Sequence, residues 1–318
     1  MRAVALALVA LVAAPGLAHA TDAASVEGGA SESDGTVEYV DVAPPTRALT
    51  SDERAAFVDA PMAAFVGERA EYAVEILGGE ALRVTLEVVE PVALDGGALD
   101  GTVVVPVHVE GRSMGFFDTV YPLHDTGVTL VDAETLRPVF TEKRYDERGR
   151  RSRAMLDYRD PGPVVVVSRE GDEVEADEMR VEAPLPDAAW DEIGMLFDLR
   201  TQPMQPGDEY AYTYHDAFDL WRTHARVQGP DVLYTDAGFI DGTAVEFHDQ
   251  TLASERGLPW GPDRTLPPVL IADSRPNHTA TVLFATDPTR SPLGADIESW
   301  IGDLRIRRVA WTPGQGAR

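Results

Sequence analysis

Cysteine is missing from all 318 residues. Its absence excludes disulfide bonds, thiol nucleophiles and thiolate metal ligands, so the stability of the fold must come from burial of apolar side chains. Beyond the first residues, long apolar runs are missing as well, and we therefore expect no membrane-spanning helix. Hydrophobic residues still make up 44% of the sequence, which is enough for a substantial core.

The sequence motifs of several enzyme classes are also missing. There is no G-x-S-x-G nucleophile elbow, no dinucleotide fingerprint, no phosphate-binding loop and no H-E-x-x-H zinc pattern. We therefore expect no cofactor, and the sequence favours a protein that is not an enzyme.

Basic residues are scarce relative to acidic ones. The chain has 27 lysine and arginine residues against 54 aspartate and glutamate residues, which gives a formal net charge of −27. A field of this sign repels nucleic acids and anionic lipid head groups, so neither is expected as a partner. Such a charge is typical of a solvated surface that resists aggregation; the alternative is attraction to cations or basic partners.

The first twenty residues have the pattern of a secretory signal peptide. Arg2 precedes an apolar run from Val4 to Ala14, and the small residues Ala18 and Ala20 frame a cleavage site before Thr21. We expect cleavage after Ala20 and a soluble, periplasmic or secreted protein. No cysteine follows the cleavage site, so we expect that the protein is not a lipoprotein. Residues 21–49 are rich in small and acidic residues and predict a disordered linker.

From Gly67 onward the apolar residues recur with a period of two. This pattern predicts half-buried antiparallel strands, because successive side chains of a strand point to opposite faces. Turn residues follow at intervals of about ten residues. We therefore predict one mainly β domain over residues 50–318, built from a single curved antiparallel sheet in the form of a half-barrel, a barrel or a sandwich. The strands are expected at 72–76, 82–88, 103–109, 140–145, 152–158, 164–167, 210–214, 239–240, 244–247 and 304–311.

A few local signals refine this prediction. Thr50 and Glu53 form a capping box that predicts a helix over 50–57, and Asp187 is expected to cap a second helix over 187–199. The dipeptide Asp241-Gly242 predicts a hairpin turn. The apolar pattern slips by one residue near 308, which predicts a β-bulge. Residues 250–278 are rich in proline and glycine and predict a long surface excursion.

Four segments resemble a bacterial envelope family catalogued as domain of unknown function 3108. They are Gly67–Tyr72, Asp132–Pro138, Phe197–Asp208 and Ala285–Pro292. The resemblance implies an exported, largely antiparallel β domain and no catalytic residues. The third segment holds Asp198, Arg200, Pro206 and Gly207, to which we assign structural roles. Arg200 is expected to bind the carbonyl groups at a helix C-terminus, and Gly207 to supply a turn conformation.

The triplet Asp125-Thr126-Gly127 is the pattern of an aspartic protease. In such enzymes two aspartates share a proton, because two close carboxylates cannot both ionise. A single triplet would require a homodimer. The alternative is a turn that connects two strands, since aspartate and glycine both favour turns.

Three histidines, His124, His215 and His248, each precede an aspartate. Clustered together, they would offer ligands for zinc or another divalent ion. Neighbouring residues of a strand face opposite ways, however, so each pair offers one ligand to a common site. The alternative is that these are surface histidines and that the protein holds no metal.

Aromatic residues fall into two groups. They are Phe116, Phe117 and Tyr121 in the first group, and Tyr210, Tyr212, Tyr214 and Trp221 in the second. Aromatic side chains on a curved sheet either fill the core or line a cavity for an apolar ligand.

These observations favour a non-enzymatic periplasmic β domain that binds or carries an apolar or envelope-derived ligand, or contacts another envelope protein. The first alternative is a secreted hydrolase that acts through Asp125 or a histidine-bound metal. The second is a structural role in which a sheet edge pairs with a partner.

Overall fold

The computed structural model describes residues 43–147, 150–159, 164–171, 174–182, 189–215, 219–235, 238–254, 278–299 and 302–315. The predicted signal peptide, residues 21–42 of the predicted linker and residues 255–277 of the predicted excursion lie outside the described residues. A two-residue strand, β1 (Thr46–Arg47), falls within the segment expected to be a linker.

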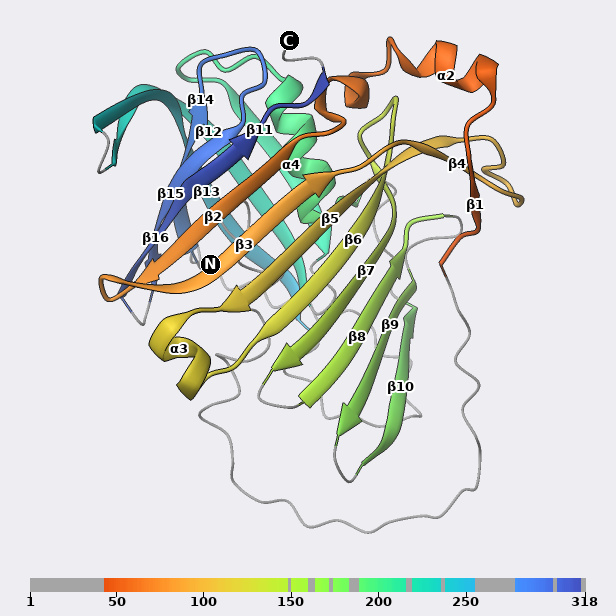
Figure 1. The fold of residues 1–318 in the computed structure, drawn as a ribbon, viewed down its shortest axis with the longest axis horizontal. Helices are drawn as coiled ribbons and strands as arrows, with labels where there is room; N and C mark the ends of the chain where they lie inside the picture. Colours follow the sequence, from red (N-terminus) through yellow and green to blue (C-terminus); the bar gives the residue numbers. More distant parts are fainter. Residues whose placement is uncertain are drawn as a thin grey trace.

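The described strands form one antiparallel sheet (Figure 1), which confirms the predicted fold class. In its first part the strands pair in chain order, apart from the short β4 (Val92–Leu94), which pairs with β1 and β5. The strands of this part are β2 (Arg69–Ile76), β3 (Gly79–Val88), β5 (Val103–Ser113), β6 (His124–Asp132), β7 (Pro138–Glu147), β8 (Arg150–Asp157), β9 (Val164–Gly171) and β10 (Val174–Glu182).

The second part of the sheet also pairs in chain order. Its strands are β11 (Glu209–His215), β12 (Asp219–Thr235), β13 (Gly238–Ser254), β14 (His278–Ala285), β15 (Pro292–Ser299) and β16 (Gly302–Thr312). The two parts join where β16 pairs with β2, with Ile306 opposite Val74. Among the described residues the end strands β10 and β11 do not pair with each other, so the sheet curves without closing into a barrel.

The described helices are short. They are α2 (Ser51–Phe57), the 3-10 helix η2 (Pro61–Phe65), α3 (Gly115–Val120) and α4 (Glu192–Thr201). The capping box of α2 is confirmed: the Thr50 side chain accepts a hydrogen bond from the Glu53 N–H, and the Glu53 carboxylate accepts one from the Thr50 N–H. Among the described residues, no helix combines the length and apolar composition needed to span a bilayer.

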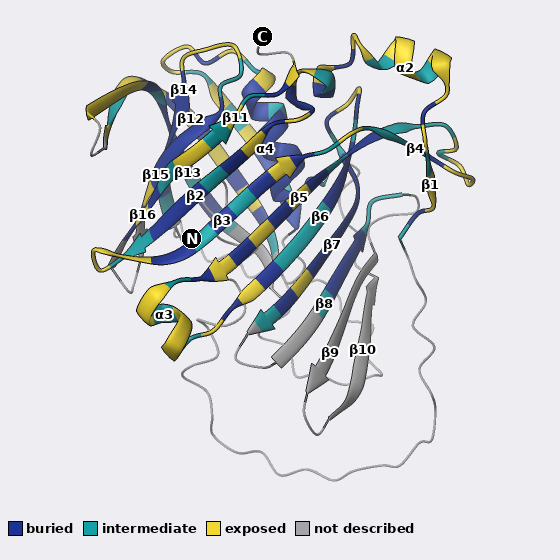
Figure 2. Ribbon diagram, in the orientation of Figure 1, coloured by how far each residue is buried: buried dark blue, intermediate teal, exposed yellow. Residues whose placement is uncertain are grey.

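Helix α4 lies in the hollow of the curved sheet (Figure 1), and Figure 2 shows it buried along most of its length. Eight of its ten residues are buried. A helix that is buried on all sides belongs to the interior of a fold. The helix begins later than predicted: its cap is Asp191, whose side chain accepts a hydrogen bond from the Gly194 N–H at 2.7 Å. Asp187, the predicted cap, lies outside the described residues. We call the side of the sheet that faces α4 the concave face, and the opposite side the convex face.

The hairpin predicted at Asp241-Gly242 is wrong, because both residues lie inside strand β13. Gly242 stands where a neighbouring strand comes close: a Cβ atom at this position would lie 2.5 Å from Cγ of Leu283 on β14. Glycine is required there by packing rather than by a turn. The bulge predicted in the last strand is confirmed by a register shift between Arg308 and Ala310.

Candidate functional site

The concave face is apolar across consecutive strands. Residues opposite each other in paired strands point to the same side of a sheet, so the register defines rows of neighbouring side chains. One row crosses seven strands, from β11 to β2, and contains Tyr210, Ala225, Phe247, Ala280, Ile297, Leu304 and Ile76. The adjacent row begins at Val227 on β12, which lies opposite Val245 on β13. It contains Val227, Val245, Val282, Ala295, Ile306, Val74 and Leu82.

Aromatic side chains form one wall of this face, at β11 and β12. Tyr214 stacks on Trp221 with ring centroids 6.4 Å apart, and Tyr212 meets Trp190 edge-on at 5.6 Å. The Tyr212 hydroxyl donates a hydrogen bond to the Asp198 carboxylate at 2.8 Å. Burial, together with the charge of Asp198, raises the pKa of Tyr212. The structure thus brings the second predicted aromatic group together.

A polar layer lies on the same face, beneath the N-terminus of α4. Asp191 is fully buried, and its carboxylate accepts hydrogen bonds from the hydroxyl groups of Thr129 at 2.6 Å and Thr141 at 2.8 Å. The same side chain caps α4 through Gly194. Asp191 therefore fixes the start of the helix against β6 and β7.

Glu192, the first residue of α4, makes a buried ion pair with strand β7. Lys143 on β7 places Nζ 2.9 Å from Oε1 and 3.0 Å from Oε2 of Glu192. Both side chains are 1% exposed. Charges at this depth require a partner, so the pair holds the helix in one position relative to the sheet.

At the other end of α4, Arg200 is buried between two rings, with its guanidinium carbon 4.3 Å from the centroid of Phe65 and 5.0 Å from that of Phe197. It donates hydrogen bonds to the Glu68 carboxylate at 2.6 Å and to the carbonyl of Thr289 at 3.0 Å. The prediction that the Arg200 side chain binds the carbonyl groups at the C-terminus of the helix is therefore wrong.

Those carbonyls are bound by Arg290, which donates to the backbone oxygens of Arg200 and Gln202. The turn after the helix follows the expectation: Gly207 has a φ of +93°, a conformation that favours glycine. Pro206 beside it packs closely on Gly229 of β12, where a Cβ would lie 3.2 Å from the proline Cγ. The motif residues Asp198, Arg200, Pro206 and Gly207 therefore make contacts that hold α4 and β11 in place.

The three candidate metal-binding histidines are not brought together. His124 is exposed on the convex face beside Glu110, and His248 is half-buried beside Glu246. His215 is buried at the end of β11. Within the part of the chain that the structure describes, no group of three or more histidine or acidic side chains is arranged to hold a metal ion.

Asp125 is fully buried on β6, and its Oδ1 accepts a hydrogen bond from the backbone N–H of Asp146 at 3.0 Å. The alternative prediction of a connecting turn at Asp125-Thr126-Gly127 is wrong, because the triplet lies within the strand. Its neighbour His124 faces the other way, as expected for successive residues of a strand.

The first aromatic group lies apart from the second. Phe116 and Phe117 belong to α3, and Tyr121 follows it, at the junction of β5 and β6. Phe116 is 74% exposed, whereas Phe117 and Tyr121 are half-buried against the core. These residues lie at a rim of the sheet rather than on the wall formed by Tyr214 and Trp221.

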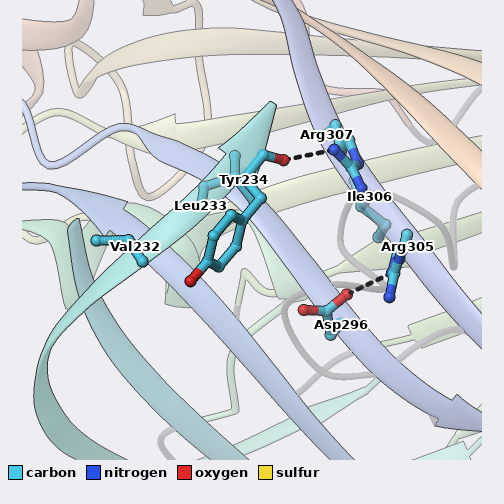
Figure 3. Close-up of a pocket in the computed structure, with 7 residues that line it drawn as sticks. All are labelled: Val232, Leu233, Tyr234, Asp296, Arg305, Ile306 and Arg307. Atoms are coloured by element: carbon cyan, nitrogen blue, oxygen red, sulfur yellow. Dashed lines mark hydrogen bonds and ion pairs between the residues drawn. The ribbon is translucent and has the colours of Figure 1, made fainter. Parts of the chain in front are cut away.

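A cavity of about 300 Å³ lies on the convex face, where the end of β12 passes over β15 and β16 (Figure 3). Leu233 lies over Gly294, whose Cβ would be 3.4 Å from the leucine methyl groups. Arg307 donates to the carbonyl of Tyr234, and Arg305 lies 3.5 Å from Asp296. Because both guanidinium groups already have partners, this cavity is a weaker candidate than the concave face.

Sequence reasoning missed the polar layer. Thr141, Lys143 and Tyr145 alternate with outward residues of β7, so their inward position could have been read from the period of two. Asp191 and Glu192, the partners of Thr141 and Lys143, could not be predicted in this way, because they lie about fifty residues later in the chain.

The sequence model of the family described as "Protein of unknown function (DUF3108)" matches residues 71–308, which confirms the resemblance seen in the motifs. No curated protein matches the chain.

Three solved structures are similar to the chain. A β-barrel-like protein of domain of unknown function DUF1849 from Brucella abortus has 11% identity, with 78% of this chain and 98% of that chain covered, and a TM-score of 0.44. A Parabacteroides distasonis protein provisionally described as a lipoprotein has 10% identity, coverage of 80% and 98%, and a TM-score of 0.29. A Bacteroides fragilis protein provisionally described as exported, with a YmcC-like fold, has 11% identity, coverage of 79% and 99%, and a TM-score of 0.27.

Proposed function

The chain belongs to the DUF3108 family of proteins of unknown function, and from this premise we propose that it is an exported, non-enzymatic β domain that holds an apolar ligand on its concave face. The export signal in residues 1–20 supports a periplasmic or secreted location. The apolar rows of the concave face support the ligand class.

The observation that carries the proposal is the disparity in size between the sheet and its helix. The sheet contains a continuous path of fourteen paired strands. Neighbouring strands lie about 4.8 Å apart, so the sheet is about 60 Å wide along its curve. The ten residues of α4 form a rod about 15 Å long. It packs chiefly against β6 and β11. One such helix is much shorter than the sheet is wide, although row residues such as Phe247 and Ile297 are each only 1% exposed. An apolar ligand would share this interior with α4.

A polar group on this face would orient such a ligand. Thr223 on β12 lies opposite Tyr212 and Asp249 in the register and is fully buried. In the described part of the chain its hydroxyl has no hydrogen-bond partner. A buried hydroxyl without a partner is costly, and the polar end of a ligand would satisfy it. An amphiphile such as a fatty acid combines both features.

The proposal is tested on the mature protein, residues 21–318, with a fluorescent fatty acid as the probe and native mass spectrometry for co-purifying lipid. Ala280 and Thr281 are neighbours on β14 that face opposite sides, Ala280 being part of the apolar row. We expect Ala280→Phe to weaken probe binding at least about tenfold by filling the concave face. Thr281→Phe, on the convex face, is the matched control and should bind as the unmodified protein does.

Circular dichroism and thermal unfolding establish that both variants fold. Equal probe binding by folded Ala280→Phe and Thr281→Phe proteins would place the probe elsewhere. A mature protein that binds no probe and carries no lipid after purification would refute the carrier role.

A further inference from the structure

Helix α3 contributes little to the core. None of its six residues is buried, although Phe116, Phe117 and Val120 are apolar. Phe116 is 74% exposed and Val120 is 45% exposed. Helices this short are not stable alone and usually depend on an apolar face packed against the protein. Here Phe116 and Val120 are exposed, whereas Phe117 is half-buried against the core.

A third exposed apolar residue lies at the same rim. Leu77 forms the turn between β2 and β3 and is 84% exposed. Its φ of +53° is uncommon for a residue with a side chain. Helix α3 packs against β3, and the Met114 N–H before the helix donates to the carbonyl of Ala81 on that strand. Figure 1 shows α3 beside the β2–β3 turn. We call Leu77, Phe116 and Val120 the α3 rim.

The α3 rim is continuous with the apolar interior. Phe116 meets Phe117 edge-on, with ring centroids 6.3 Å apart. Phe117 and Tyr121 in turn pack against the core cluster that contains Val74, Leu82 and other residues of the concave face. Apolar contacts therefore link the exposed side chain of Phe116, through Phe117, to the interior proposed to hold the ligand.

Basic side chains lie next to this rim on the convex face. Arg83, Arg112 and His124 stand opposite one another on β3, β5 and β6. Glu80 pairs with Arg83, and Glu110 with His124. Across the described ranges no carboxylate pairs with Arg112, which lies only four residues before Phe116. In a chain of net charge −27, Arg112 is therefore able to interact with an anionic group.

Exposed apolar residues beside the guanidinium group of Arg112 fit the surface of a phospholipid bilayer, where phosphate groups lie above apolar chains. The overall negative charge disfavours an anionic membrane and a second copy of the chain. We propose that the α3 rim docks on a zwitterionic phospholipid bilayer, with its apolar side chains in the interface and Arg112 near lipid phosphates. This inference rests on the proposed function and adds that the concave face takes up its ligand from the bilayer on which the α3 rim docks.

The test is flotation of the mature protein with phosphatidylcholine vesicles. Phe116→Asp places a charge where an apolar side chain enters the interface, and we expect at least a tenfold loss of bound protein. The matched control is Phe239→Asp, because Phe239 is 71% exposed but lies on β13; this variant should float as the unmodified protein does. Arg112→Glu should also weaken flotation, whereas Arg226→Glu, at an exposed arginine of β12, should not.

Three results would overturn the docking proposal. They are absence of flotation for the unmodified protein, equal loss in the Phe116→Asp and Phe239→Asp variants, and a dimer in analytical ultracentrifugation that Phe116→Asp dissociates. The fatty-acid probe, measured without vesicles, separates this inference from the proposed function. Phe116→Asp should keep its probe affinity but take up probe from vesicles at least tenfold more slowly. Flotation that depends on Phe116 in a protein that binds no probe would support docking and refute the carrier role.

Discussion

Lys143 on β7 and Glu192 at the start of α4 form an ion pair whose two side chains are each 1% exposed, with 2.9 Å between Nζ and Oε1. The pair joins residues 49 positions apart and lies beside the buried carboxylate of Asp191. A buried ion pair is poor evidence of net stability, because desolvation offsets most of the attraction. It does specify position, since any shift of the helix would leave a charge without its partner.

Removal of one partner should therefore cost more than removal of both. We expect Lys143→Met to lower the free energy of unfolding by about 3–5 kcal/mol, because Glu192 is left as a buried charge. The double variant Lys143→Met/Glu192→Met should recover most of that loss. Urea unfolding of the two variants measures the difference. Equal losses in the single and double variants would show that the pair is not coupled.

Arg200 should not tolerate replacement by lysine. Its guanidinium group donates to Glu68 and to the Thr289 carbonyl while it lies over the rings of Phe65 and Phe197. An ammonium group lacks the planar fork needed for these contacts together. We expect Arg200→Lys to lower the free energy of unfolding by about 2–3 kcal/mol. Arg226→Lys, at an exposed site, serves as the control, and a similar loss there would contradict this explanation.

Gly194 lies inside α4, where alanine is normally the better helix former by about 1 kcal/mol. A Cβ at this position would lie 2.9 Å from the Leu136 carbonyl oxygen and 3.1 Å from Pro138 Cδ. The cost of overpacking against backbone should exceed the gain in propensity, so we expect Gly194→Ala to destabilise the fold by about 1–2 kcal/mol. Thermal unfolding tests the sign. Gly79→Ala, where the nearest atom is 3.9 Å away, should change stability far less.

Local patterns in the sequence correctly predicted the elements that are determined by interactions between neighbouring residues. The period of two gave the strands around Tyr72 and Leu82, and the Thr50–Glu53 capping box gave α2, because these signals need only neighbouring residues. The slip near Arg308 gave the bulge for the same reason. The resemblance to the DUF3108 family also implied a largely antiparallel β domain, and the family's model matches residues 71–308.

The wrong predictions all involve distant partners. The sequence pattern predicts Asp187 as the cap of the helix; the observed cap of α4 is Asp191, whose carboxylate also accepts hydrogen bonds from Thr129 and Thr141. In the sequence Gly242 resembles a turn residue, but in the fold it lies within a strand, against Leu283 of the next strand. The candidate site shows the same limit: sequence grouped Tyr212, Tyr214 and Trp221, yet nothing local indicated that Lys143 and Glu192 face the same interior.

The capping box should make α2 sensitive to acid. Hydrogen bonds from Arg47, then from the Thr50 backbone, lower the pKa of Glu53 from 4.5 to about 2. Because the folded-state pKa is the lower one, the stabilisation is present above pH 4.5 and is lost as the pH falls towards 2. We expect Glu53→Gln to reduce hydrogen-exchange protection of α2 at pH 7, and the difference to disappear near pH 2. A difference that persists at low pH would contradict the assignment to the carboxylate.

Thr223 and Thr141 should respond in opposite directions to the same isosteric change. The buried Thr223 hydroxyl has no hydrogen-bond partner in the described ranges, so Thr223→Val removes an unsatisfied group and should raise the free energy of unfolding by about 1 kcal/mol. Thr141→Val removes a hydrogen bond to Asp191 and should lower it by about 1.5–3 kcal/mol. If the Thr223 hydroxyl binds the polar end of a ligand, Thr223→Val also weakens binding of the fatty-acid probe while Thr141→Val does not. Urea unfolding of lipid-free protein and probe titration separate the two effects, and a Thr223→Val protein less stable than its parent would show that the hydroxyl is already satisfied within the fold.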